Sequence, residues 1–110
     1  MNPDIKSKWI QALRSGNYKQ AKGSLRVDDG FCCLGVLCDV YQKEVGDANW
    51  ENCAFMEQKQ ILPKKVYEWA GLHSVSPYVS LDADRGISLA SMNDVGDDFA
   101  KIADVIERDL

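Results

Sequence analysis

Two adjacent cysteines, Cys32 and Cys33, are the residues of this chain best suited to nucleophilic chemistry. They stand where a predicted helix begins, and the dipole of a helix lowers the pKa of a thiol at its N-terminus. His73 and Asn93 follow in the order Cys, His, Asn, which is the order in papain-type proteases. One interpretation is therefore a small Cys-dependent hydrolase with these four residues as its catalytic set.

The same cysteines also fit a purely structural role. The run from residue 30 to residue 41 is almost entirely apolar, so it predicts a buried central helix. Reduced thiols in such a helix act as small hydrophobic side chains. Cys33 and Cys38 have a spacing that one half of a zinc site would tolerate, but the chain has no second pair and a single histidine, His73. We expect no metal and no cofactor.

A second set of residues suits ligand binding rather than catalysis. Aromatic rings beside Lys and Arg can hold a nucleobase and its phosphates, and such residues gather between positions 18 and 26, with Trp50 or Tyr78 as further aromatic candidates. The acids near position 94 are typical of turns and helix caps. The side chains of Asn93 and Asp94 could also order a binding site. The predicted ligand-binding residues are Tyr18, Lys19, Gln20, Lys22, Arg26, Asn93 and Asp94.

Charge is divided unevenly along the chain, whose net charge is −4. Residues 1–26 contain six Lys or Arg and one Asp, whereas residues 82–110 contain three Lys or Arg and eight acids. The two ends could attract each other within the fold, or the basic end could meet an anionic partner. Because the whole domain is acidic, we do not expect it to bind long nucleic acids.

The helices that must position these residues are marked by caps and apolar spacing. Asn2 and Pro3 begin a helix that ends before Gly16, and Pro63 begins a short one that ends at Gly71. The central helix spans residues 31–44, capped by Asp28 or Asp29, and Asp97 caps a last helix that reaches residue 110. Gly35 inside the central helix predicts the close approach of another element.

A β-hairpin is predicted at about 77–90, because apolar residues alternate on two arms around a turn rich in Asp and Gly. A short strand is predicted near 25–27 and another near 53–56. The chain should therefore be a single α+β domain over residues 1–110, mostly α, with about four helices around the buried central helix 31–44. No apolar stretch reaches the roughly 20 residues that span a bilayer, and the first residues are polar, so we expect a cytosolic protein without membrane contact.

Several segments together resemble a group of small proteins encoded by tailed phages and prophages. The resemblance covers almost the whole chain and implies no activity of its own. It implies a viral protein in the cytoplasm of a bacterial host. The segments are WxxALRSGxYxQ at 9–20, FCCLGVLCD at 31–39, LP at 62–63 with WAGL at 69–72, and LxxMNDxGxxFxxIADxIE at 89–107.

This resemblance favours a non-enzymatic accessory protein that binds a host factor or a small anionic, nucleotide-type ligand, in counter-defence or host takeover. The Cys-dependent hydrolase is the first alternative. An oligomeric protein-interaction module is the second, with Trp50 as an anchor at the interface between copies.

Overall fold

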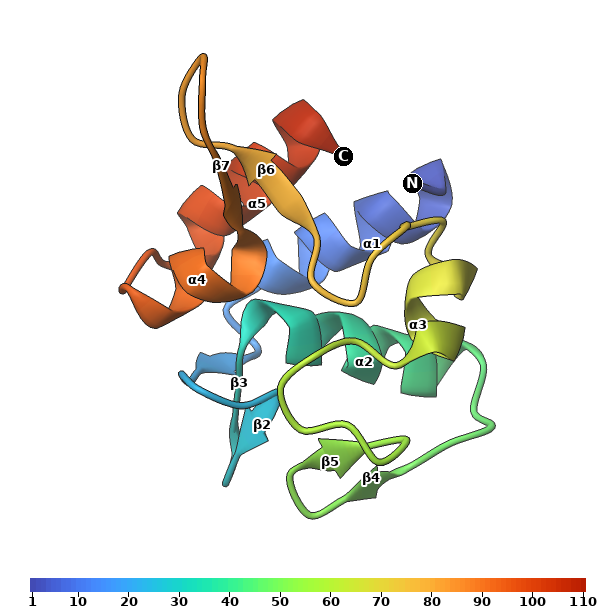
Figure 1. Cartoon of the computed structure of the whole chain (residues 1–110). Coiled ribbons are helices and arrows are strands. Elements are labelled where there is room, and N and C mark those ends of the chain that lie inside the picture. The colour runs from blue at the N-terminus through green and yellow to red at the C-terminus, as the bar shows by residue number, and fades with distance from the viewer.

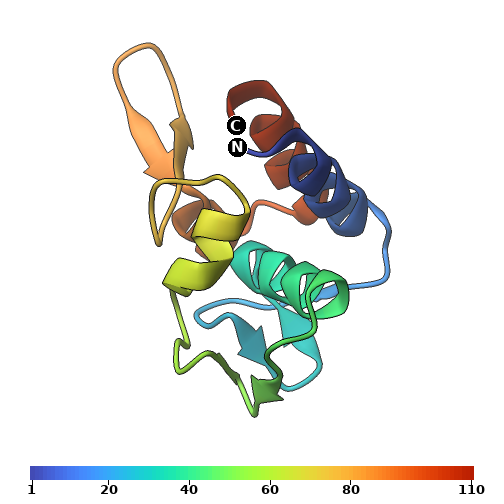
Figure 2. The same ribbon diagram turned by 90° about the vertical axis from the view of Figure 1, so that its right-hand side faces the viewer.

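Helix α2 (Cys33–Glu44) lies at the centre of the computed structural model, which describes residues 1–110 (Figure 1). Its first six residues are all buried, and its second half turns one face to solvent. Helices α1 (Pro3–Arg14) and α5 (Phe99–Asp109) pack together on one side of it. Helix α4 (Leu89–Asp94) packs at its N-terminal end and α3 (Lys64–Trp69) at its C-terminal end (Figures 1 and 2).

The strands are short and form three separate small sheets. Strands β1 (Lys19–Gln20) and β2 (Arg26–Val27) both pair with β3 (Gly30–Phe31), β1 in parallel and β2 antiparallel. The hairpin β4 (Trp50–Glu51) and β5 (Ala54–Phe55) lies on the same side of α2 (Figure 1). The hairpin β6 (Tyr78–Ser80) and β7 (Gly86–Ser88) projects from the opposite side.

The prediction of an α+β, mostly α fold around a central helix is confirmed. The hairpin and the cap at Asn2, whose side chain accepts from the backbone N–H groups of Asp4 and Ile5, are also as predicted. The sequence analysis located four of the five helices by their residues. Helix α4 was missed because six residues are too few to reveal a helical period.

Two predicted helix caps are wrong by one to four residues. Helix α2 begins at Cys33 rather than at 31, because residues 30–31 pair as β3, and its N-cap is Cys32, whose sulfur accepts from the backbone N–H of Gly35 at 3.4 Å. Asp28 and Asp29 instead form the turn between β2 and β3. Helix α5 is capped by Asp98, whose neighbour Asp97 binds the side chain of Lys101.

Some of the basic residues near the N-terminus pair with acidic residues near the C-terminus within the fold. On α1, Arg14 forms ion pairs with Asp104 and Glu107 of α5, at 2.7 and 2.9 Å. The side chain of Lys6 donates to the backbone carbonyl of Glu107. Each of these exposed contacts contributes little to stability, but together they align the basic helix with the acidic one. No helix of the molecule is long and apolar enough to cross a membrane.

Gly35 is the place where another segment touches α2 most closely, as predicted. A Cβ at this position would collide with the backbone carbonyl of Leu25. The same carbonyl accepts from the backbone N–H of Cys32 at 3.1 Å. The segment that leads into β2 is therefore pressed directly against the first turn of α2.

We predict that Gly35→Ala destabilises the protein by about 4 kcal/mol or more, because neither backbone can move away without breaking the fold. The midpoint of thermal unfolding, measured by circular dichroism, should fall by more than about 15 °C. Gly16→Ala is the matched control: the space around it is open and only its positive φ of 78° opposes a side chain, at about 1–2 kcal/mol. Equal midpoints for the two variants would contradict the prediction.

Candidate functional site

Asn93, a predicted ligand residue, is fully buried and tied to three segments. Its side-chain oxygen accepts from the side chain of Gln20 at 2.9 Å and from the backbone N–H of Cys33 at 3.2 Å. Its side-chain amide donates to the backbone carbonyl of Ala21 at 2.7 Å. Asn93 thus joins α4, the N-terminus of α2 and the β1 segment, and these bonds occupy the groups that a ligand would need.

Two other predicted ligand residues, Gln20 and Asp94, form hydrogen bonds in the same region. Gln20 also donates to the backbone carbonyl of Asp97 at 2.8 Å. The carboxylate of Asp94 accepts from the backbone N–H of Gly23 at 3.0 Å. The structure therefore brings Gln20, Asn93 and Asp94 together, and all three hold the loop before β2 against α4.

The cysteines of α2 and its cap are buried thiols. Cys33 is inaccessible, and its sulfur donates to the backbone carbonyl of Leu89. Burial raises the pKa of Cys32 and raises the pKa values of Cys33 and Cys38 well above their ordinary values. The helix dipole was expected to lower the pKa at the helix start, and the cost of burying a thiolate outweighs it.

The structure does not place His73 beside these thiols. Cys32 lines a hollow of about 240 Å³ together with Ser24, Gln60 and Asp94. His73 is exposed in the loop after α3, at the opposite end of α2, and lines other hollows with Gly71 and Leu72. No group of three or more His, Cys, Asp or Glu side chains could hold a metal ion.

Tyr18 and Trp50 meet around a residue that the sequence analysis overlooked. The carboxylate of Asp39 on α2 accepts from the Tyr18 hydroxyl at 2.5 Å and from the Trp50 ring N–H at 3.1 Å. The ring of Phe31 lies edge-on between the two, with centroid distances of 5.2 and 5.6 Å. A single acid within an apolar helical run was the signal that could have identified Asp39.

Lys43, one helical turn after Asp39, completes this group. Its ammonium donates to the Tyr18 hydroxyl at 3.1 Å and lies 3.2 Å from the Asp39 carboxylate. Burial and the bond to Asp39 raise the pKa of Tyr18, and the bonds to Tyr18 and Asp39 raise the pKa of Lys43. Lys43 therefore remains a fixed, fully charged ammonium at neutral pH.

Arg26 lies on the other side of the same rings. Its guanidinium stands 5.0 Å from the Phe31 centroid and 5.5 Å from the Trp50 centroid, and its Nε donates to the backbone carbonyl of Asp28. It has no carboxylate partner. The other three arginines, Arg14, Arg85 and Arg108, each pair with at least one acid.

The remaining basic candidates point elsewhere. The ammonium of Lys19 faces Asp29 at 3.5 Å, and Lys22 lies beside Gly96 in the turn between α4 and α5. Tyr78 stands on β6, in the hairpin that projects from the other side of α2. The structure therefore keeps Tyr18, Arg26 and Trp50 as one aromatic and basic surface and separates the two lysines from it.

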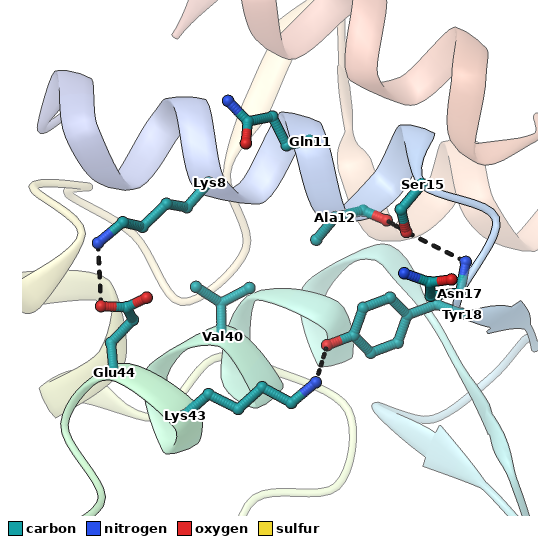
Figure 3. A pocket seen from close by; sticks show the side chains of 9 residues that line it. All are labelled: Lys8, Gln11, Ala12, Ser15, Asn17, Tyr18, Val40, Lys43 and Glu44. Carbon is teal, nitrogen blue, oxygen red and sulfur yellow. Dashed lines mark hydrogen bonds and ion pairs between the residues drawn. The ribbon is translucent and has the colours of Figure 1, made fainter.

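A groove of about 320 Å³ opens beside Tyr18, between α1 and α2 (Figure 3). Its ends are polar: Lys8 and Glu44 form an ion pair at one end, and Tyr18 and Lys43 meet at the other. Ala12 and Val40 form an apolar stretch between the ends. The lining residues are Lys8, Gln11, Ala12, Ser15, Asn17, Tyr18, Val40, Lys43 and Glu44.

We predict that Asn93→Ala destabilises the protein by about 3 kcal/mol, since it removes three hydrogen bonds, one of them to the buried backbone N–H of Cys33. Asp94→Ala, the neighbouring control, removes a single bond at the surface and should cost less than about 1 kcal/mol. Urea unfolding followed by tryptophan fluorescence measures both. A smaller loss for Asn93→Ala than for Asp94→Ala would contradict the structural role of Asn93.

We also predict that the thiols of the folded protein react unequally with an aromatic disulfide reagent at neutral pH. Cys53, which is partly exposed, should react first, while the three thiols of the central segment should react only after denaturation. Mass spectrometry of the labelled peptides identifies the order. Rapid labelling of Cys32 or Cys33 would favour the hydrolase interpretation.

Comparison with known proteins places this architecture in a family without assigning it an activity. The model of a domain of unknown function, DUF8296, matches residues 1–110. Neither the curated proteins nor the solved structures gave a match. Since the family match extends over the whole length described here, the chain belongs to the DUF8296 family.

Proposed function

We propose that this chain is a non-enzymatic phage accessory protein that binds an acidic segment of a host bacterial protein through Arg26. One observation carries the proposal: the guanidinium carbon of Arg26 lies 5.0 and 5.5 Å from the ring centroids of Phe31 and Trp50, and Arg26 has no acid of its own. A guanidinium held in this way presents a fork of donors that matches a carboxylate. Less conformational entropy is lost on binding because the contacts with the two rings and the bond from Nε to the carbonyl of Asp28 already restrict the side chain.

The surroundings of Arg26 suit a protein partner. Trp50, whose ring lies beside Arg26, is only partly buried. Arg and Trp are the residue types that most often dominate the energy of protein interfaces. Arg26 is partly exposed and does not line the groove between α1 and α2. The expected partner group is an Asp or Glu side chain flanked by apolar residues.

The biological setting of the proposal comes from the resemblance to small phage proteins. It supports a role in the host cytoplasm, in counter-defence or host takeover. The hydrolase alternative is less favoured, since its thiols are buried and His73 lies at the far end of α2. The ring N–H of Trp50, the anchor of the oligomer alternative, is already bound to Asp39.

We predict that Arg26→Glu abolishes capture of the host protein. A central arginine contributes about 2 kcal/mol or more to an interface, so affinity should fall at least about 30-fold. Arg26→Lys should lose part of the affinity because an ammonium cannot form the paired contact. The measurement is affinity capture from a bacterial lysate with the immobilised variants, followed by calorimetry with the purified partner.

Lys64→Glu is the matched control, because it reverses one exposed charge on α3, away from the aromatic rings. It should capture the same partner as the unaltered protein, and Lys19→Glu and Lys22→Glu should have smaller effects than Arg26→Glu. All variants should keep their thermal midpoints within a few degrees. A partner retained by Arg26→Glu, or lost equally with Lys64→Glu, would refute the assignment.

A further inference from the structure

The groove between α1 and α2 is a second surface, distinct from the guanidinium of Arg26. One wall is a single face of α1, since its residues follow the helical spacing 8, 11, 12 and 15. At 1.5 Å per residue this wall is about 10 Å long. The facing wall is formed by Val40, Lys43 and Glu44, which share one face of α2 (Figure 3).

The Tyr18 end of the groove offers hydrogen-bond donors. Both carboxylate oxygens of Asp39 are already engaged by Tyr18 and Trp50, so little of its acceptor capacity remains, and its side chain is only 13% exposed. The side chain of Lys43 is 65% exposed, and its ammonium uses two of its three protons on Tyr18 and Asp39. The third proton and the side chain of Asn17 are available to an anion in the groove.

The C-terminus of α1 also lies at this end, where free carbonyls would disfavour an anion. Ser15 reduces that effect. Both its backbone N–H and its hydroxyl donate to the carbonyl of Ala12, at 3.3 and 2.6 Å. This carbonyl is therefore satisfied within the helix end and does not oppose a bound phosphate.

The opposite end of the groove has a different character. Lys8 and Glu44 form an ion pair at 2.9 Å and are each nearly half exposed. Together they present a donor and an acceptor side by side, with the amide of Gln11 nearby in the lining. The edge of a nucleobase needs this mixture, whereas a phosphate needs donors alone. The apolar stretch of Ala12 and Val40 would lie under the ring between the ends.

We infer that the groove binds a nucleoside monophosphate, with its phosphate at Lys43 and Tyr18 and its base toward Lys8 and Glu44. The volume of about 320 Å³ is at the small end of ligand sites, which favours one nucleotide over a dinucleotide or a polymer. The inference does not depend on the host-protein interface, because the two sites use different side chains.

The test is isothermal titration of the whole chain with the four nucleoside 5′-monophosphates. Inorganic phosphate and the unphosphorylated nucleosides are the comparison ligands. At least one monophosphate should bind, at least ten-fold more tightly than either of its parts. Lys43→Met should weaken binding about ten-fold or more, as expected for the loss of a charge-assisted hydrogen bond. Glu44→Gln should change the preference among the bases.

Lys65→Met is the matched control. Its side chain is 64% exposed and its ammonium is paired with Asp47, so it resembles Lys43 in exposure and pairing but lies outside the groove. It should bind nucleotides as the unaltered protein does, and so should Arg26→Glu.

Three results would overturn the inference. One is that no monophosphate binds, and another is that phosphate alone binds as tightly. The third is that Lys43→Met has no effect or that Arg26→Glu abolishes nucleotide binding, which would place the ligand elsewhere. Loss of host-protein capture with intact nucleotide binding in Arg26→Glu would show that the two sites act separately.

Discussion

The contact between the backbone of Leu25 and the face of Gly35 determines where the N-terminal third of the chain can lie. Leu25 is held from both sides: its N–H donates to the carbonyl of Lys59, and its carbonyl accepts from Cys32. Because Gly35 has no side chain, the segment 20–27 lies directly on the first turn of α2. A larger residue would push away β2 and with it Arg26, the residue that the proposed interface requires.

Asn93 holds the same part of the chain through side-chain hydrogen bonds. A buried amide without partners costs about 1–3 kcal/mol, so its burial is stable only where every group is matched. Here the matching groups come from β1 and α2. No buried side-chain nitrogen or oxygen in the molecule lacks a partner. The loop that follows β1 is thus held by specific bonds, although few of its residues are apolar.

The pairing of charges within the fold determines which surfaces keep hydrogen-bond donors available to a partner. The basic face of α1 and the acidic face of α5 meet at Arg14, which removes much of the asymmetry between the two ends of the chain. Phe31 and Tyr18 then separate two places where donors stay accessible, Arg26 on one side and Lys43 on the other. A shared aromatic wall therefore supports both the proposed interface and the proposed nucleotide groove.

The sequence by itself determined the elements whose signals are local. Each of these signals depends on residues that are close together in the chain. They are the cap at Asn2, the apolar run of α2, the turn of the β6–β7 hairpin and the apolar stripe of α5. Gly35 also revealed a close contact, because a glycine is costly inside a helix and needs a compensating neighbour. Helix α4 and the parallel pairing of β1 with β3 are too short to carry a period.

Only the tertiary structure decided which candidate residues meet. Gln20, Asn93 and Asp94 suited a ligand by type, yet long-range packing uses them to hold the fold together. Cys32 and His73 line different hollows, Lys19 faces Asp29, and Lys22 lies beside Gly96. Asp39 became central because the fold places Tyr18 and Trp50, 21 and 11 residues away in the chain, on its two oxygens. Such contacts depend on how whole elements pack, and residue type and spacing do not encode that directly.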